Sequence, residues 1–414
     1  MATNAKNIAE LLNTDTTVAV GDIADGSVTT AKLASDAVTN AKIADEAIQT
    51  ENIKDEFIEV QGGSFERNLL MNGDMSINQR KSGTTGSYAD PTDGNFGLDR
   101  WKMWNSNGGA ATFSQETEVP SGTRFEYSQK IEVTTADTSI AAGDYLALAQ
   151  YVEGSRHKRM GFGASGAKTS YISFWVRSSL TGTYCYSIRN NTPNRSFVKE
   201  FTIDTADTWE KKTFTIAGDT GGTWSSSRAG IGAIHQISLT MGSTYQGTAD
   251  SWQGSNVVAT SNQVNLMAST HDFYVTGWQV EDTEHTPFQF LSHHDNLRNC
   301  QRFYLKSYPF DNEPGVAANA GRGQTRVHAD QASTGRYPWS QKWPVEMASN
   351  PTVTIYPART AVAATAGNVS QYNGNNIASV TNYSPALRVG VSTYIGAPSS
   401  YNQLTFNYVC DSEL

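Results

Sequence analysis

The chain has 414 residues with a formal net charge of −9, and it contains 35 glycines, 10% aromatic residues and 17% charged residues. This composition is typical of a β-rich globular protein with many turns and excludes a disordered chain. The acidic balance without a lysine or arginine run excludes a nucleic-acid-binding protein, and three widely spaced cysteines, Cys185, Cys300 and Cys410, argue against a disulfide scaffold or a zinc site.

The first 17 residues predict a short helix. In "NAKNIAELL", Ile8, Leu11 and Leu12 have helical spacing. The stretch lacks the basic start and apolar run of a signal peptide, and no window of the sequence is long and apolar enough to span a bilayer. We therefore expect the protein to be made in a cytoplasm.

Residues 18–60 carry a ten-residue repeat with a large apolar residue at every fifth position. Five residues turn an α-helix by about 140°, which would scatter the apolar residues around it, and an odd spacing alternates faces in a strand. A compound unit fits better, and a unit that cannot bury its own apolar face must associate. The repeat therefore predicts a stalk of three identical chains, with a flexible Ala/Thr/Asp linker as the alternative. The expected trimer-core residues are Val28, Leu33, Val38, Ile43, Ile48 and Ile53.

Residues 61–290 contain many short alternating strands separated by Gly-rich or Asp/Thr-rich turns. The stretch opens on "VQGGSFERNLLMNGDMSINQR", a Gly pair followed by an alternating apolar run. In "YISFWVRSS", Ile172, Phe174 and Val176 fall on one face of a strand, and "GTYCYSIRN", "KKTFTIAGD" and "FYVTGWQVE" alternate likewise. This pattern predicts one antiparallel β-sandwich or jelly roll. Its tryptophans are expected to be core or interface residues rather than ligand platforms: Trp101, Trp104, Trp175, Trp209 and Trp278.

Residues 291–306 are expected to link the sandwich to a second domain, and "NLRNCQRFYLKS" could be a short helix or a long strand. Residues 307–414 contain further strands, such as "NPTVTIYPA" and "QLTFNYVCDSEL", with long polar loops between them. The predicted fold class is therefore mainly β. A short N-terminal helix and a trimeric repeat stalk precede an antiparallel β-sandwich or jelly roll and a smaller C-terminal β-domain.

No catalytic motif stands in a supporting context: there is no nucleophile elbow, phosphate-binding loop or metalloprotease signature. His293 and His294, with His285 nearby, could hold a metal around a threefold axis, but an exposed linker is the favoured explanation. The acidic stretch "ADPTDGN", residues 89–95, lacks the downstream Glu of a calcium loop and favours an ordinary turn. We expect no catalysis, no cofactor and no metal.

Several stretches resemble one family. The decads "GSVTTAKLASDAVTNAKIADEA" resemble the shaft repeats of bacteriophage tail fibres. "RNLLMNGDMSINQR" and "GLDRWKMW" resemble the opening of a phage fibre domain related to carbohydrate-binding-module jelly rolls, and residues 215–306 resemble its later part. "VCDSEL" is similar to the short acidic end of many such fibres. The resemblance implies a homotrimer located in the virion that attaches to the host surface. Residues 1–17 are expected to dock on a tail or other virion protein, since the other end of the chain carries the bulky domains.

The expected function is attachment of the virion to a host surface polysaccharide or lipopolysaccharide, without nucleic-acid binding or membrane insertion. The alternatives are a glycan-degrading tailspike and a head or tail decoration fibre without a receptor. The distal domain, 307–414, is expected to make the contact, because aromatic faces stack on sugar rings while amide and guanidinium groups bond the hydroxyls. The candidate receptor-binding residues are Trp339, Tyr337, Arg336, Tyr372 and Asn375. Burial of Trp339 and Trp343 in the trimer interface is the alternative, and the concave face of the 66–290 sandwich is the next candidate site.

Overall fold

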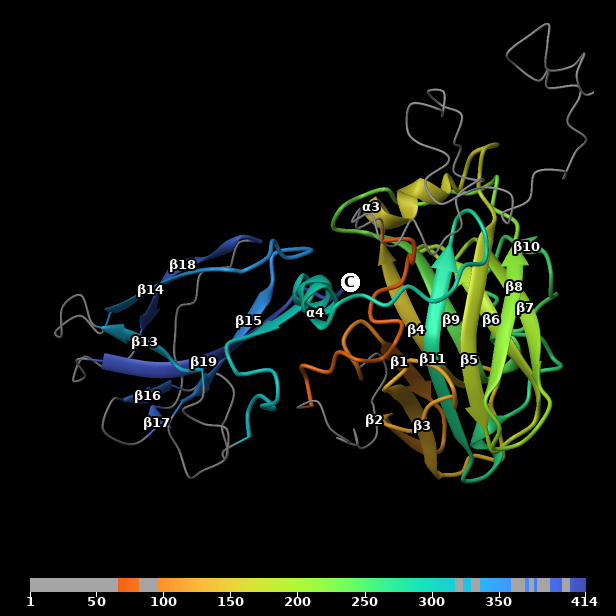
Figure 1. The fold of residues 1–414 in the computed structure, drawn as a ribbon, viewed down its shortest axis with the longest axis horizontal. Helices are drawn as coiled ribbons and strands as arrows, with labels where there is room; N and C mark the ends of the chain where they lie inside the picture. The colour runs from red at the N-terminus through yellow and green to blue at the C-terminus, as the bar shows by residue number, and fades with distance from the viewer. Residues whose placement is uncertain are drawn as a thin grey trace, which may run out of the picture. The chain divides into compact units, whose positions relative to one another are not determined.

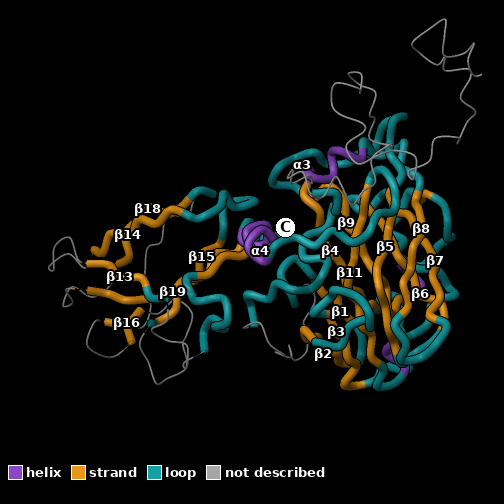
Figure 2. The backbone as a smooth tube through the Cα atoms, in the orientation of Figure 1, coloured by secondary structure: helices purple, strands orange, loops and turns teal. Residues whose placement is uncertain are grey.

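A computed structural model describes residues 66–81, 96–316, 323–328, 336–358, 369–371, 376–377, 388–396 and 403–414. They belong to one compact unit, Glu66–Leu414. Strands predominate, helices are short, and the ladders between the described strands are antiparallel (Figures 1 and 2). The mainly-β prediction is confirmed. The expected N-terminal helix and repeat stalk lie outside the described residues.

Two sheets form a β-sandwich (Figure 1). The six-stranded sheet has the order β1-β4-β9-β6-β7-β10, with bounds Lys102–Ser106 (β1), Tyr145–Glu153 (β4), Ile231–Met241 (β9), Gly182–Arg189 (β6), Ser196–Ile203 (β7) and Trp252–Gln253 (β10). The five-stranded sheet has the order β2-β3-β11-β5-β8, with bounds Ala110–Glu116 (β2), Ser128–Thr135 (β3), Asp272–Glu281 (β11), Ser170–Ser178 (β5) and Glu210–Ile216 (β8).

The sandwich core is built from one face of each strand, as the sequence alternation predicts. Ile172, Phe174 and Val176 of β5 are fully buried in the main hydrophobic cluster. Trp101 and Trp278 are also fully buried, and their rings stack with centroids 4.8 Å apart. Burial of these large aromatic surfaces supplies much of the free energy that holds the two sheets together.

The stretch 67–80 forms no strand, although its alternating apolar residues suggested one. In this stretch, asparagine side chains bond the backbone N–H and C=O groups that a neighbouring strand would otherwise bond. The amide of Asn72 donates from Nδ2 to the carbonyl oxygen of Ile77 at 2.9 Å and accepts at Oδ1 from the Ile77 N–H at 2.8 Å. Asn68 Oδ1 accepts from the Val280 N–H of β11 at 2.9 Å. Local side-chain bonds of this kind compete with regular structure, so the apolar alternation here reflects burial alone.

The segment 291–306, expected as a linker, contains a helix and a strand. Helix α4, His293–Gln301, begins at the N-cap Ser292, whose hydroxyl accepts from the Asp295 N–H at 3.1 Å. Strand β12, Tyr304–Lys306, then pairs with β19, Gln403–Asp411. The other strands of this half are β13 (Thr325–His328), β14 (Arg336–Lys342), β15 (Thr352–Pro357), β16 (Val369–Gln371), β17 (Asn376–Ile377) and β18 (Gly390–Gly396).

Strand β19 organises the C-terminal sheet. Strands β12 and β15 both pair with its residues 409–411, so they occupy opposite edges of β19. Strands β13 and β16 both pair with residues 404–405 and are likewise on opposite edges. Strands β14 and β18 form a separate two-stranded ladder. It packs against β19 in a second hydrophobic cluster that includes Phe406.

Ion pairs connect the stretch 67–81 and the loop before β1 to the end of β19 and the residues after it. Arg80 contacts Asp411 through Nη1 at 3.1 Å and Glu413 through Nη2 at 3.2 Å. Arg100 also pairs with Glu413, and its guanidinium lies over the Phe303 ring, 3.4 Å from the centroid. The two halves of the described unit are therefore joined through a network of charges whose centre, Arg100 and Glu413, is held away from water.

The helical segments are short. Besides α4 they are α3 (Gly154–His157), η6 (Lys158–Met160), η7 (Ser243–Tyr245) and η8 (Leu266–Ala268). Among the described residues, no helix has the length and apolar character needed to cross a membrane. Cys185, Cys300 and Cys410 are buried and free.

Two buried histidines predict a loss of stability in acid. Burial lowers the pKa of His157 to about 4 and that of His235 to about 3, and the Tyr186 hydroxyl lies 2.7 Å from His235 Nδ1. Below pH 6.5 the unfolded chain binds protons that the folded chain excludes, so stability falls as the pH falls toward the folded-state pKa values. We expect the free energy of unfolding to drop by about 1.4 kcal/mol per pH unit for each histidine.

The measurement is denaturant unfolding of the parent and of His235→Gln between pH 6.5 and 4.5. Glutamine keeps a polar partner for Tyr186 and does not titrate, so the variant should lose less stability over this range. Burial raises the pKa of Asp99 to about 6 and works in the opposite direction, but it acts equally in both proteins. Equal losses in parent and variant would contradict the assignment.

Candidate functional site

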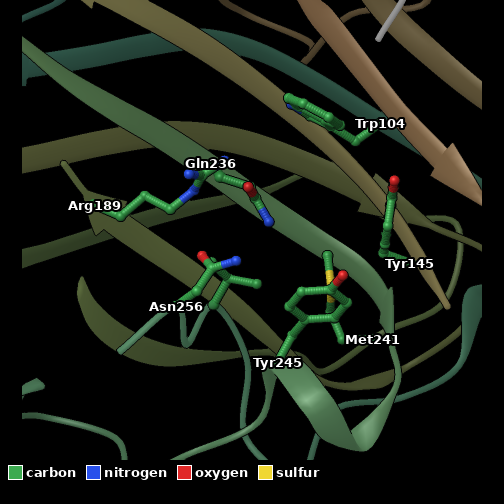
Figure 3. Close-up of a pocket in the computed structure, with 8 residues that line it drawn as sticks. Trp104, Tyr145, Arg189, Gln236, Met241, Tyr245 and Asn256 are labelled. Carbon is green, nitrogen blue, oxygen red and sulfur yellow. The ribbon is translucent and has the colours of Figure 1, made fainter. Parts of the chain in front are cut away.

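A hollow of about 180 Å³ opens on the face of the six-stranded sheet that points away from the sandwich core (Figure 3). Alternation along β1 shows the two faces: Met103 is buried in the core, and its neighbour Trp104 lines the hollow. The volume is below the roughly 300 Å³ of a typical drug-sized site and suits a single sugar ring. The lining residues are Trp104, Tyr145, Arg189, Gln236, Met241, Tyr245, Asn256 and Val258.

Two small residues of β4 lie next to residues that line the hollow. Trp104 pairs with Ala147 across the β1–β4 ladder, and Gln236 pairs with Ala149 across the β4–β9 ladder. Side chains at i and i+2 of a strand share a face, so both alanines belong to the face that carries Trp104 and Gln236. Both alanines are fully buried, and Trp104 packs against the clusters that contain them.

Three half-buried aromatic rings form one wall of this site. The Trp104 and Tyr145 rings meet edge to face with centroids 6.2 Å apart, and the Tyr145 and Tyr245 rings meet likewise at 5.6 Å. Tyr145 begins β4 and Tyr245 ends η7, so distant parts of the chain supply the wall. Such rings present an apolar face beside a polar tip, which suits ligands that combine C–H surfaces with hydroxyl groups.

Three buried polar atoms of residues that line the hollow lack partners. Trp104 Nε1, Arg189 Nε and Asn256 Oδ1 are buried and make no hydrogen bond with any described residue. Figure 3 shows Arg189 and Gln236 extending into the space between Trp104 and Asn256. A buried polar atom without a partner is costly, and native structures keep few of them unless water or a ligand completes the bond. Two donors and one acceptor around one cavity indicate a polar ligand.

A second hollow, of about 750 Å³, lies beside α4 and is less suited to a ligand. The carboxylate of Asp74 at its wall already accepts from Asn296 Nδ2 at 3.0 Å and from the Ser76 hydroxyl at 3.1 Å. The Arg124 guanidinium stacks on Phe290, 4.7 Å from the ring centroid. These wall groups find partners within the protein, unlike Trp104 Nε1, Arg189 Nε and Asn256 Oδ1 of the sheet-face hollow.

The structure corrects the expectation that Tyr337 and Trp339 lie in an exposed loop. Both belong to β14 and are only 0% and 2% exposed, inside the cluster around β19. The Trp339 ring meets Phe406 edge to face at 5.0 Å. Their rings fill the C-terminal core because β14 alternates like any strand packed on one face.

Of the remaining sequence candidates, the structure describes only the backbone of Arg336. Arg336 opens β14, where its backbone pairs with Gly396. Tyr372 and Asn375 lie outside the described residues. The sequence analysis did not identify the residues of the site on the six-stranded sheet, because they are far apart in the sequence. Only the concave face of the sandwich was anticipated, and Trp104 was assigned to burial.

Two of the histidines considered for a metal, His293 and His285, pack against different aromatic rings. His293 begins α4 and packs against the Phe310 ring at 5.1 Å, whereas His285 packs against Tyr171 at 5.3 Å. No group of three or more His, Cys, Asp or Glu residues that could hold a metal occurs in the part of the chain that the structure describes. The acidic stretch 89–95 lies outside it.

Comparison with known proteins gives distant structural similarities. No protein-family model matches the sequence, and no curated protein does. The enzymatically active domain of tailspike protein 4 from bacteriophage CBA120 is 11% identical over 52% of this chain and 21% of its own, with a TM-score of 0.29. A putative sugar binding protein from Bacteroides thetaiotaomicron is 11% identical over 52% of this chain and 100% of its own, also at 0.29. The family 11 carbohydrate-binding module of a Clostridium thermocellum cellulase is 11% identical over 49% of this chain and 98% of its own, at 0.25. The chain thus spans about a fifth of the tailspike domain, and at these TM-scores the site must be judged from its own geometry.

Proposed function

We propose that this protein is a homotrimeric structural fibre of a bacteriophage that attaches the virion to a glycan on the host surface. The hollow on the six-stranded sheet carries the binding part of the proposal, because it joins an aromatic wall to unpaired hydrogen-bonding atoms. The sequence repeat supports the trimer, and the resemblance to phage tail fibres supports location in the virion.

The chemistry of the hollow suits a sugar. A pyranose ring has an apolar C–H face that stacks on an indole or phenol ring, and equatorial hydroxyls that both donate and accept. Trp104 offers both a ring face and an unpaired N–H, and Asn256 offers an unpaired carbonyl oxygen. One sugar unit can therefore use both kinds of group in a space of about 180 Å³.

Replacing Trp104 with alanine is expected to weaken glycan binding by about thirtyfold or more, because a buried aromatic anchor contributes about 2 kcal/mol or more. The measurement is binding of fluorescent protein to a bacterial glycan array, followed by titration of the best ligand. Trp104→Phe keeps a ring but removes the N–H and should lie between the parent and Trp104→Ala.

The matched control is Trp175→Ala, which removes a half-buried tryptophan from β5 on the other sheet. It should bind like the parent. If Trp104→Ala folds and binds glycans as tightly as the parent, the hollow is not the receptor site. Release of free oligosaccharide during the assay would favour a glycan-degrading tailspike, and absence of any glycan binding by the parent would favour a decoration fibre.

A further inference from the structure

Arg189 is a cation without an anion. It ends β6, its side chain is half-buried in the wall of the hollow, and its guanidinium makes no ion pair or hydrogen bond with any described residue. Other partly buried arginines of the sandwich have a carboxylate: Arg195 pairs with Asp219, Arg156 with Glu66 and Arg177 with Asp207.

The surroundings of Arg189 leave its charge uncompensated. None of the residues that line the hollow is acidic. Burial lowers the pKa of Arg189, and the groups that partly restore it are the Tyr151 and Tyr245 hydroxyls rather than a carboxylate. The hollow is therefore locally positive on a chain whose net charge is −9.

A buried guanidinium is best satisfied by a group that carries negative charge and accepts more than one hydrogen bond. A neutral hydroxyl would accept one bond and leave the charge unpaired in a site partly removed from water. Carboxylate and phosphate groups meet both needs, and they are the usual anionic substituents of acidic sugars.

We propose that the hollow binds a sugar unit carrying an anionic substituent, a carboxylate or a phosphate, with Arg189 as the residue that selects the charge. This inference rests on the proposed function and names the substrate class of the same site. The Arg189 guanidinium donates to the anionic oxygens, while Trp104 and Asn256 bond the neutral part of the sugar. The selectivity arises because a neutral analogue leaves the half-buried Arg189 charge, with its buried Nε, without an anion.

The test compares matched sugars on one array. One arm holds uronic-acid oligosaccharides beside the same oligosaccharides with each carboxylate reduced to a primary alcohol. The other arm holds phosphorylated bacterial oligosaccharides beside their dephosphorylated forms. We expect the parent to bind the charged member of at least one pair roughly ten- to a hundredfold more tightly than its neutral partner, and the arm that responds identifies the anion.

The decisive variant is Arg189→Gln. It should lose this discrimination, so that both members of a pair bind with the weak affinity of the neutral sugar, and Arg189→Lys should restore part of the preference. Arg177→Gln, the same substitution at a paired arginine of the five-stranded sheet, should keep the full preference. Circular dichroism and the unfolding midpoint of each variant show whether it is folded.

Two outcomes separate this inference from the proposed function. If the parent binds neutral sugars at least as well as acidic ones, and Trp104→Ala abolishes that binding, the receptor site stands and the acidic-sugar inference is overturned. If the parent prefers the charged sugars and Arg189→Gln keeps that preference, another residue selects the charge and the role given to Arg189 is wrong. If neither Trp104→Ala nor Arg189→Gln changes binding, both proposals fail.

Discussion

Replacing Glu413 with alanine is expected to lower the free energy of unfolding by about 3–5 kcal/mol, because it removes one partner of a buried ion pair and leaves the other charged. The side chains of Arg100 and Glu413 are only 2% and 4% exposed. Glu413 also faces Arg80 at 3.2 Å. Its loss therefore leaves the buried Arg100 guanidinium without its carboxylate and removes one of the two ion-pair partners of Arg80.

The neighbouring groups cannot replace Glu413. Arg100 donates to the Tyr151 carbonyl oxygen and stacks on Phe303, but both are neutral. Burial acts to lower the pKa of Arg80, and the charges of Asp411 and Glu413 outweigh it and raise the pKa instead. The protonated state of Arg80 is thus held partly by the carboxylate that the substitution removes.

The matched control is Asp411→Ala, which removes the other carboxylate facing Arg80. The Asp411 side chain is 40% exposed. Water can compensate for its loss, and the expected effect is at most about 1 kcal/mol. Guanidinium unfolding at one fixed protein concentration measures both variants. Similar effects of the two substitutions would show that burial does not decide the strength of this junction.

The second large effect is expected on the oligomeric state, from substitutions in the ten-residue repeat of residues 18–60. Changing Val38 and Ile43 together to aspartate should convert the proposed trimer into monomers, because each layer of a threefold stalk would then hold three carboxylates next to one another without counter-charges. Sedimentation equilibrium or light scattering measures the molecular mass directly.

A control pair places the same charges between the apolar positions. Thr39 and Ala41 lie inside the same decad but not at the five-residue spacing. Thr39→Asp with Ala41→Asp should therefore leave the trimer intact. A Val38→Asp, Ile43→Asp protein that remains trimeric would remove the reason for assigning residues 18–60 to a stalk.

Strand alternation made most of the sandwich predictable from the sequence. The prediction failed where side chains form local hydrogen bonds with the backbone. The faces of β5 follow directly from "YISFWVRSS", because burial of Ile172, Phe174 and Val176 requires only a period of two. The stretch 67–80 has the same apolar rhythm without a strand, since Asn68 and Asn72 bond the backbone with their side chains. The order of apolar and polar residues in the sequence is the same in both cases and does not distinguish a strand from an irregular buried stretch.

The candidate site was less predictable for a geometric reason. Trp104, Arg189 and Asn256 come from β1, the end of β6 and a loop after β10, and only the strand order of the sheet brings them to one hollow. Trp339 is the opposite case: it lies in a polar stretch of the sequence and was a candidate for an exposed site, but in the structure it is buried in the C-terminal core. Whether an arginine such as Arg189 has a carboxylate partner is likewise a property of the folded chain.

The position of β19 has a consequence for how quickly the protein matures. Among the described strands, β12, β13 and β15 have only β19 as a ladder partner, and Tyr304 of β12 meets Asp411 roughly a hundred residues further along. Closing such long loops is entropically unfavourable and slows folding, whereas a local hairpin such as β6–β7 forms early. During synthesis, the edges of β12, β13 and β15 stay open until β19 has left the ribosome. We therefore expect the β12–β19 half of the protein to need chaperones for longest and to be the most prone to aggregation during synthesis.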